Sequence, residues 1–419
     1  MRAKSENAGL SAEAADAVNA ADAADAAQVS GTENISPAAD AADARIDGIL
    51  AELDEIDRQM AALYIDRLRK NAEIAERKLE LHLPVANREE EERKLGVVRA
   101  KSRDRFVQEA MEELYKQILS VSRRYQYLVQ SRHGVQPDLG FRAVDQLPAP
   151  KNVVYQGIEG AYGNMAAENY FRQFENVHFF HVTKFEDAIR EVEEKRAEYA
   201  VLPIENSTVG PVVDTLDILM RHSVSIVGEY FLPVRHCLLA LPGVKPEEIR
   251  SICSHPQALM QCGDFFRSHP ELRRTTADNT AVAAKKVRDD GDRTQAAIAS
   301  ALSAKLYGLE VLIDGLNQHE ENTTRFIVAG REKIYRFEAK KTSMVFETAH
   351  EAGALYNLLG SFYFNRINMV KLESRPIPDV PWDYRFFADI DGSLSDPAVI
   401  NALTAIARQA RGFRILGCY

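Results

Sequence analysis

The sequence lacks the features that mark several large classes of protein. It has four cysteines in 419 residues and no C-x-x-C pair, so they are expected to be reduced thiols in a cytoplasmic protein. No run of 18 or more apolar residues occurs, and the N-terminus has no apolar core of the signal-peptide kind. The net charge of −10 lacks the basic excess of a nucleic-acid binder. We therefore expect neither a membrane nor a nucleic-acid partner. The cysteines are Cys237, Cys253, Cys262 and Cys418.

The first 44 residues also lack large apolar side chains at a regular spacing. They hold eight acids and two bases, a net of −6. Such a segment buries too little apolar surface to offset the entropy lost on ordering. Residues 1–44 are predicted to be a disordered tail. The length of the rest favours two to four folded units.

Residues 45–132 show the period of packed helices. Their first apolar series steps by four and three residues, as in a helical bundle. It consists of Ile49, Leu53, Ile56, Met60 and Leu63. Leu83-Pro84 ends that helix, and two more helices follow. One long apolar seam on three helices predicts pairing with a second copy of the chain.

The pattern changes twice after the helical part. Residues 133–151 contain three prolines and no clear period, which predicts a linker. Residues 152–332 alternate short apolar strands with helices, so they are expected to form an α/β unit. Residues 340–419 follow the order βαββαβ, which is ferredoxin-like. The chain is thus expected to be multidomain.

Two cations lie on the helix face that should be buried. Arg67 and Lys78 are eleven residues apart, about three turns, so they share a face of the first helix. Either their stems pack while their charged heads reach water, or they clamp a buried anion. Ser122 and Gln126, one turn apart on the third helix, are a weaker signal of the same kind.

Polar side chains follow several apolar strands of the α/β unit. Asn206, Ser207 and Thr208 come after "VLPIE", His255 follows "RSICS", and Thr280 begins another helix. Each is also explained as an ordinary helix cap. Several such positions at strand ends in one α/β unit indicate a ligand cleft.

The helical part resembles an all-α, type II chorismate mutase. The resemblance rests on "DEIDRQMAALYIDRLRKNAEIAERKLELHLPV" and "LYKQILSVSRRYQYLV". It implies rearrangement of chorismate to prephenate by holding the dianion folded and placing positive charge near the breaking ether bond. Leu50 and Glu90 stand where the family has arginines, which leaves both an active and an inactive mutase open. The resemblance implies that Arg67 and Ser122 each bind a carboxylate of the ligand and that Lys78 and Gln126 contact its ether oxygen. It also implies that Glu91 binds the substrate hydroxyl. Asn87 stands where the family has aspartate.

The α/β unit resembles prephenate dehydratase. "PIENS" (203–207), "SHPQ" (254–257) and "NTTRF" (322–326) match the family's signatures in order and spacing. The resemblance implies a two-lobed fold like that of periplasmic binding proteins, with crossings near residues 229 and 312, and no metal or organic cofactor. Thr324 is implied as the hydrogen-bond donor or relay for the leaving hydroxide, and Arg325 as the ligand of a substrate carboxylate. The other implied cleft residues are Asn206, Ser207, Thr208, His255, Thr280 and Phe326.

The last unit resembles an ACT regulatory domain of the phenylalanine-binding kind. "GALY" (353–356) and "ESRP" (373–376) carry the resemblance, and a glycine-led turn lets a ligand approach the backbone. Phenylalanine bound between two such domains is expected to favour a closed, low-activity dehydratase. The implied ligand residues are Gly353, Ala354, Leu355, Glu373, Ser374, Arg375 and Pro376.

Three functions remain from the sequence. The first is a homo-oligomeric, bifunctional enzyme that converts chorismate to prephenate and prephenate to phenylpyruvate, inhibited by L-phenylalanine. The second keeps the dehydratase but makes the helical part an inactive dimerisation domain. The third is a non-catalytic, two-lobed ligand sensor. Arogenate stays open as an alternative substrate of the dehydratase.

Overall fold

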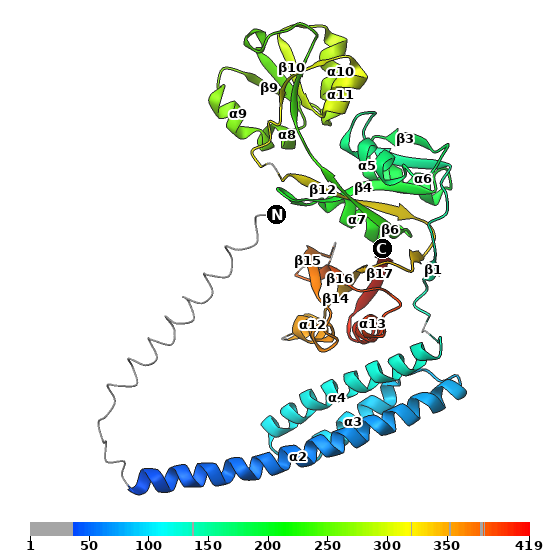
Figure 1. Ribbon diagram of the computed structural model, residues 1–419, viewed down its shortest axis with the longest axis vertical. Helices are drawn as coiled ribbons and strands as arrows, with labels where there is room; N and C mark the ends of the chain where they lie inside the picture. Colours follow the sequence, from blue (N-terminus) through cyan, green and yellow to red (C-terminus); the bar gives the residue numbers. More distant parts are fainter. Residues whose placement is uncertain (1–36, 136–137, 320, 352, 378–379, 381) are drawn as a thin grey trace, which may run out of the picture. The chain divides into compact units, whose positions relative to one another are not determined.

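The chain forms two compact units, residues 1–70 and residues 71–419, with the boundary inside helix α2 (Pro37–Glu80). The computed structural model describes residues 37–135, 138–319, 321–351, 353–377, 380 and 382–419 (Figure 1). Residues 1–36 of the predicted tail lie outside this range. The helix begins earlier than the predicted boundary at 45, because Pro37 and the alanines after it suit a helix start.

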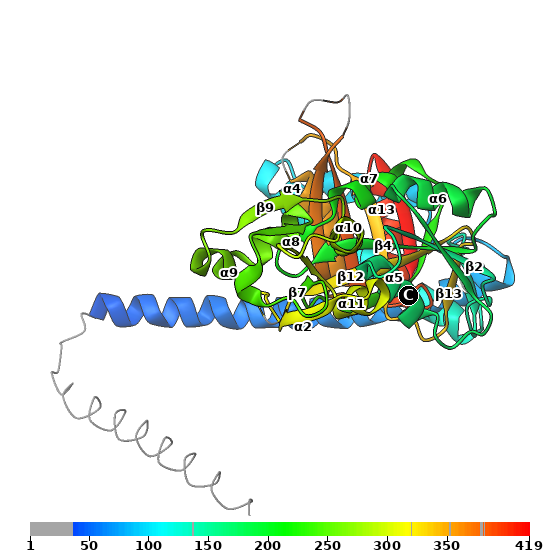
Figure 2. The same ribbon diagram turned by 90° about the horizontal axis from the view of Figure 1, so that it is seen from above.

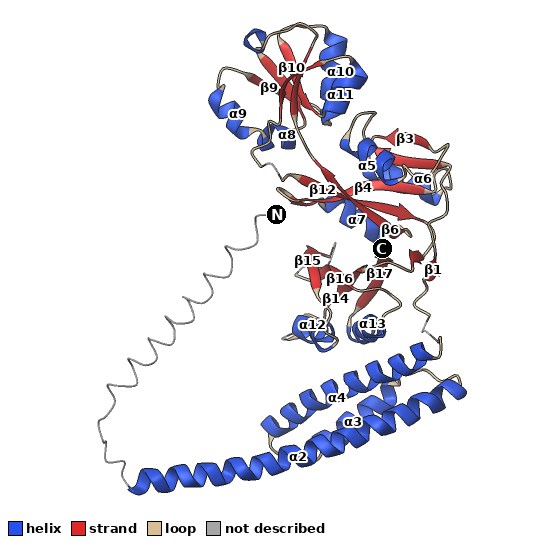
Figure 3. Cartoon of the chain, in the orientation of Figure 1, coloured by secondary structure: helices blue, strands red, loops and turns tan. Residues whose placement is uncertain are grey.

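Three helices and no strand form the helical part (Figure 3). They are α2, α3 (Arg88–Arg99) and α4 (Arg105–Arg132). The side chain of Asn87 caps α3 by accepting a hydrogen bond from the Glu90 amide at 3.2 Å. Within residues 45–70 the apolar stripe of α2 is exposed, since Ile56 shows 50% of its surface and Leu63 71%.

The α/β part consists of two lobes, as predicted, and the first lobe holds the N-terminal strands and the returning strand. Its elements are β2 (Asn152–Gln156), α5 (Tyr162–Tyr170), β3 (His178–Val182), α6 (Phe185–Glu193), β4 (Tyr199–Asn206), β5 (Gly210–Pro211), α7 (Val213–Arg221), β6 (Ser225–Pro233) and β12 (Thr323–Gly330). Strand β12 runs antiparallel between β6 and β4, and lies beside β4 in both views (Figure 1 and Figure 2).

The second lobe is a five-stranded sheet in the order β11-β7-β10-β8-β9. Its elements are β7 (Cys237–Ala240), η1 (Pro246–Glu248), β8 (Ser251–Ser254), α8 (Pro256–Gln261), α9 (Gly263–Ser268), β9 (Arg273–Thr276), α10 (Thr280–Asp290), β10 (Gln295–Ala299), α11 (Ala301–Tyr307) and β11 (Glu310–Asp314). The chain enters this lobe between β6 and β7 and leaves it between β11 and β12. Both crossings fall a few residues later than predicted, because β6 continues to Pro233 and β11 to Asp314.

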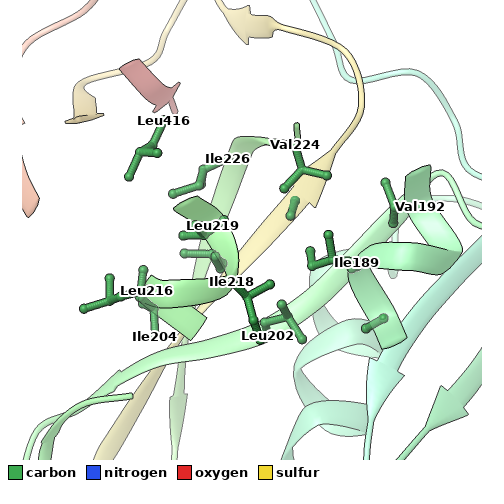
Figure 4. Close-up of a cluster of buried hydrophobic side chains, with 14 of the residues drawn as sticks. Ile189, Val192, Leu202, Ile204, Leu216, Ile218, Leu219, Val224, Ile226 and Leu416 are labelled. Atoms are coloured by element: carbon green, nitrogen blue, oxygen red, sulfur yellow. The ribbon is translucent and has the colours of Figure 1, made fainter. Parts of the chain in front are cut away.

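The C-terminal part, residues 340–419, is called the last unit below and has the predicted element order. It runs β14 (Lys341–Glu347), α12 (Ala354–Phe364), β15 (Met369–Pro376), β16 (Tyr384–Asp391), α13 (Pro397–Gln409) and β17 (Gly412–Cys418). Strand β17 pairs with β6, so one sheet continues from the first lobe into this unit. The two also share a hydrophobic core: Leu416 of β17 lies with Ile226 and Leu219 of the lobe (Figure 4).

The predicted linker is not entirely irregular. Its residues Arg142–Val144 form strand β1, which pairs in parallel with β13 (Ile334–Arg336). The two strands join the segments before and after the lobes. Over the described residues, no helix is both long and apolar enough to cross a bilayer.

Candidate active site and regulatory residues

A cavity of about 240 Å³ lies between the two lobes. The first lobe contributes α5, β4 and β12, and the second contributes the starts of α8 and α10. Five of the predicted cleft residues line it: Asn206, His255, Thr280, Thr324 and Phe326. A ligand in this cavity touches both lobes, which is the arrangement expected of a two-lobed binding fold.

A β-bulge turns Asn206 toward the cavity. Arg325 of β12 pairs with Glu205 of β4, but the next residue, Phe326, pairs with Pro203, so Ile204 is the extra residue. Side chains of a regular strand alternate between its faces, and a bulge reverses that alternation. Pro203 and Asn206 therefore both line the cavity, although they are an odd number of residues apart.

Thr324 and Asn206 form a hydrogen-bonded pair at the cavity wall. Asn206 Nδ2 lies 2.9 Å from Thr324 Oγ1 and 2.8 Å from Asn322 Oδ1. An amide nitrogen only donates, so the threonine oxygen is the acceptor here. Among the described residues no acceptor takes the Thr324 hydroxyl proton, and the side chain lines the cavity. Thr324 is thus prepared to donate a hydrogen bond to a ligand.

Arg325 points away from the cavity, because consecutive residues of a strand face opposite sides. Arg325 is 6% exposed, and its guanidinium contacts Glu229 Oε2 at 2.7 Å, Asp389 Oδ2 at 2.6 Å and Tyr419 Oη at 2.8 Å. Burial opposes the charge, but the charges of Tyr419, Asp389 and Glu229 outweigh it and raise the pKa of Arg325. Arg325 therefore joins the first lobe to the last unit, and its role as the ligand of a substrate carboxylate stays a prediction.

Ser207 and Thr208 support the wall without lining it. Ser207 Oγ accepts from the Thr323 amide at 3.0 Å and donates to Glu321 O at 3.1 Å. Thr208 donates to Asn206 Oδ1 from its amide at 3.1 Å and from its hydroxyl at 2.7 Å. Both residues therefore fix neighbours of the cavity, and neither stands in its lining.

The second lobe presents the starts of two helices to the cavity. His255 caps α8, its Nδ1 accepting from the Gln257 amide at 3.3 Å, and burial lowers its pKa although Asp278 opposes the shift. Asn279 caps α10 through the Val282 amide at 2.9 Å, and the buried Thr280 follows it. The cap interpretation and the cleft interpretation are both correct here, since the capping residues also line the cavity.

The cavity residues that were not singled out from the sequence include Tyr162, His236 and Gln261. Tyr162 begins α5 near the end of the glycine-rich "GIEGAYG" segment (157–163). That segment makes a close approach: Gly160 has φ +83°, and its carbonyl accepts from Ser303 Oγ of the second lobe at 3.0 Å. His236 is a lone histidine between two strands, a position that carries no signal by itself.

The cavity lining holds amide, hydroxyl and imidazole groups and the carboxylate of Asp278 but, among the described residues, neither lysine nor arginine. An anionic ligand there would be held by hydrogen-bond donors and by the amides at the starts of α5 and α10.

The residues implied for the mutase lie on α2, on α3 and its N-terminal cap, and on α4. Lys78 Nζ donates to Val85 O at 2.7 Å, and burial lowers its pKa while Glu90 and Glu91 oppose the shift. Gln126 Nε2 donates to Asn71 Oδ1 at 3.1 Å, while its buried Oε1 has no hydrogen-bond partner among the described residues. A buried acceptor without a donor is costly unless a ligand satisfies it.

The remaining mutase candidates have protein contacts. Glu91 accepts from Arg123 Nη1 at 2.8 Å and lies 3.4 Å from Arg408 Nη1. Ser122 Oγ donates to Ile118 O at 2.7 Å within α4. Asn87 acts as a helix cap, and Arg67 is half-buried on α2. The arginines beside Glu91 therefore include one from α4 and one from α13 of the last unit.

The proposed phenylalanine residues lie at a helix start and on an edge strand. Gly353 has φ +79° and precedes α12, which contains Ala354 and Leu355. Glu373, Ser374, Arg375 and Pro376 end β15, whose only sheet neighbour in the described residues is β16. Arg375 Nη2 contacts Asp217 Oδ2 of α7 at 3.2 Å.

Comparison with known proteins assigns these parts to known families. A family model for prephenate dehydratase matches residues 153–334, and one for chorismate mutase type II matches residues 49–127. A bifunctional chorismate mutase/prephenate dehydratase of Enterobacter agglomerans is 32% identical over 374 residues, which is 88% of this chain and 94% of that protein. The chain belongs to the bifunctional chorismate mutase/prephenate dehydratase family.

Two further relatives cover about two thirds of the chain. Arogenate dehydratase 1 of Petunia hybrida is 39% identical over 298 residues, or 66% of this chain and 69% of that protein. A crystal structure of prephenate dehydratase from Arthrobacter aurescens in complex with L-Phe gives a TM-score of 0.59 at 30% identity, covering 64% of this chain and 89% of that one.

Proposed function

We propose that the cavity converts prephenate to phenylpyruvate and that the helical part supplies prephenate from chorismate. The observation that carries the dehydratase assignment is the Thr324 hydroxyl, which accepts from Asn206 and keeps its proton for a ligand in the cavity. Family membership supports both reactions.

The geometry fits the chemistry of the dehydratase step. The bond from the ring to its carboxylate breaks, and the electron pair shifts through the ring as CO2 leaves. The ring hydroxyl departs from the opposite carbon with its own electron pair and takes up a proton to become water. A hydrogen bond from Thr324 to that oxygen becomes stronger as negative charge develops on it, which lowers the barrier.

The mutase step needs positive charge and a donor near the ether oxygen of chorismate. Lys78 and Gln126 are the proposed residues, with Arg67, Ser122, Glu91 and Asn87 binding the rest of the substrate. Gln126 Nε2 donates to Asn71, and Oε1 has no donor among the described residues, so the amide has to rotate for its nitrogen to donate to the ether oxygen.

We also propose that the last unit is an ACT domain of ferredoxin-like fold that binds L-phenylalanine and inhibits the dehydratase. The βαββαβ order, the left-handed Gly353 and the edge strand β15 support it. The proposal includes a cytoplasmic homo-oligomer. The four buried, unpaired cysteines support a reducing compartment, and the exposed apolar stripe of α2 supports pairing.

One experiment tests both activities. Purified protein is supplied separately with chorismate, prephenate and arogenate, and the products are followed by chromatography. Phenylpyruvate is expected from the first two substrates; phenylalanine formed from arogenate instead would assign the other dehydratase substrate. Thr324→Ala is expected to abolish phenylpyruvate formation while chorismate is still consumed. Equal loss of both activities would contradict separate sites.

A further inference from the structure

Helix α13 of the last unit packs against helix α4. Asn401 of α13 is fully buried, and its Nδ2 donates to Ser120 O of α4 at 3.2 Å. Arg124 Nη1 of α4 donates to Phe364 O, at the end of α12, at 2.9 Å. The last unit therefore contacts the helix that carries two of the residues implied for the mutase.

Arg408 lies on the face of α13 that meets the helical part. It follows Asn401 by seven residues, about two turns, so the two side chains share that face. Arg408 Nη1 donates to Glu91 Oε2 of α3 at 3.4 Å. Arg123 of α4 donates to the same oxygen from Nη1 at 2.8 Å and to Asn401 Oδ1 from Nε at 3.4 Å. The carboxylate of Glu91 thus lies beside one guanidinium from α4 and one from α13.

Arg408 uses little of its hydrogen-bonding capacity within the protein. A guanidinium carries five N–H donors, and the bond to Glu91 is the one hydrogen bond of Arg408 in the part of the chain that the structure describes. That bond is long, and 27% of the side chain is exposed. Arg123, with 11% of its side chain exposed, already has two partners. Of the two arginines, Arg408 is therefore the one with donors available for a ligand.

The Lys78 ammonium lies close enough to Arg408 for the two positive charges to repel each other. Burial is the main reason why the pKa of Lys78 is lowered; Glu90 and Glu91 oppose the shift, while Lys94 and Arg408 add to it. Like charges held near one another in a partly buried site raise the free energy of the unliganded protein. A bound anion would relieve that repulsion.

The charges around Lys78 leave an excess of two cations. Each of the two glutamates already has a closer cation: Lys94 Nζ lies 2.6 Å from the first carboxylate, and Arg123 Nη1 lies 2.8 Å from the second. Lys78 Nζ donates to a neutral carbonyl, and Arg408 only shares the second carboxylate at the longer distance. Chorismate is a dianion, so two positive charges in excess match its charge.

We propose that Arg408 binds a carboxylate of chorismate, so that the last unit supplies a substrate-binding cation to the mutase site of the helical part. Lys78 keeps its implied place at the ether oxygen, and Arg123 holds Glu91. The inference rests on the proposed mutase function and adds to it a residue from another part of the chain. A guanidinium suits this role because its parallel N–H groups match the two oxygens of a carboxylate.

The first test is Arg408→Met in the full-length protein, which keeps the stem and removes the guanidinium. We expect kcat/KM for chorismate to fall about 10- to 100-fold, the usual effect of losing a hydrogen bond to a charged group. Phenylpyruvate formation from prephenate, measured on the same preparation, reports whether the variant is folded. Arg408→Lys keeps the charge and should recover part of the loss.

Arg124→Met is the matched control. Arg124 also joins α4 to the last unit, but its partner is the carbonyl of Phe364 and no carboxylate. It therefore tests loss of contact between α4 and the last unit without removing a cation from beside Glu91. We expect kcat/KM for chorismate to stay within about twofold of the wild-type value. A loss as large as that of Arg408→Met would mean that packing, and no contact of Arg408 with the substrate, explains both.

A double variant separates binding of the substrate from support of Glu91. In Glu91→Gln the negative charge beside Arg408 is removed. If Arg408 binds the substrate directly, adding Arg408→Met to this variant should still lower kcat/KM for chorismate about tenfold or more. If Arg408 only holds the Glu91 carboxylate, the second substitution should have no further effect, and the inference is overturned.

The outcomes also separate the inference from the function on which it rests. Wild-type protein that converts prephenate but is inert to chorismate would remove the proposed mutase function and the inference with it. An active wild type whose kcat/KM for chorismate is unchanged in Arg408→Met would overturn the role of Arg408 alone. If Arg408→Met loses both activities, Arg408→Lys decides: KM for chorismate should rise several-fold while prephenate conversion stays normal, and an unchanged KM would overturn the inference.

Discussion

The two faces of strand β12 meet chemically different surroundings. The face with Thr324 and Phe326 meets a cavity lined mainly by apolar and neutral polar side chains, with Asp278 as its one carboxylate among the described residues. The face with Arg325 meets a cluster of buried charges drawn from the first lobe and from the last unit. One face is built to present a proton to a ligand, and the other is built to hold the strand.

The charged face continues beyond Arg325. Lys341 of β14 contacts both carboxylate oxygens of Glu229, and Lys371 of β15 contacts Glu205 at 3.0 Å. Glu205 and Arg325 are the chain neighbours of Asn206 and Thr324. The last unit therefore contacts the chain neighbours of Asn206 and Thr324, the two residues proposed for the dehydratase step.

The largest expected effect is on the charged face. Arg325→Met removes the guanidinium and leaves Glu229 and Asp389 without their shared partner in a buried site. We expect the free energy of unfolding to fall by about 3–5 kcal/mol, as when one member of a buried ion pair is removed. Chemical denaturation measures it. Arg142→Met, which breaks an exposed pair with Glu332, should change stability by less than about 1 kcal/mol; similar losses for both would refute the contrast.

A substitution on the cavity face of β12 should lower the rate of the dehydratase reaction and leave the stability of the fold nearly unchanged. Thr324→Val keeps the shape of the side chain and removes the hydroxyl. We expect kcat for prephenate to fall by about 10²–10³-fold, the usual effect of losing one donor to a developing negative charge. Thermal unfolding should change little. A variant that is strongly destabilised but retains activity would show that Thr324 belongs to the scaffold.

The sequence predicts the position of β12 but not the division between its faces. Its apolar run and polar start indicate a strand with Thr324 near a cleft, and this was confirmed by the cavity lining. The partners of Arg325 come from far along the chain: Asp389 is 64 residues away and Tyr419 is 94. No local pattern contains such contacts, so the sequence does not predict them.

Local sequence patterns also miss the contacts of Asn206 and His236 at the cavity. The bulge at Ile204 that turns Asn206 into the cavity depends on the pairing of β4 with β12 and leaves no trace in the period of "VLPIEN". His236 is found only when the fold brings Gln261 and Tyr162 to its two nitrogens. Strand-end polarity, by contrast, is local, and it located His255 and Thr280 correctly at the cavity.

A milder change on the charged face should be partly tolerated. Asp389→Asn keeps the acceptor oxygen but removes the negative charge beside Arg325. We expect a loss of about 1.5–3 kcal/mol, the range for a hydrogen bond to a charged group. In the double variant with Arg325→Met the two losses should be less than additive, because each removes the same contact. Additive losses would indicate that the residues do not act as one cluster.

The smallest expected effect is a pH dependence of the unfolding free energy that comes from the buried His236. Because burial lowers the pKa of His236 from 6.5, the unfolded state binds a proton that the folded state does not as pH falls below 6.5. Stability from this group is therefore complete above pH 6.5 and decreases below it, by up to about 1.4 kcal/mol per pH unit. The difference in unfolding free energy between pH 7.5 and 5.5 should be smaller in His236→Gln than in wild type. The exposed His350→Gln control should show the wild-type difference, and a His236→Gln slope equal to wild type would mean that the buried ring is not the titrating group.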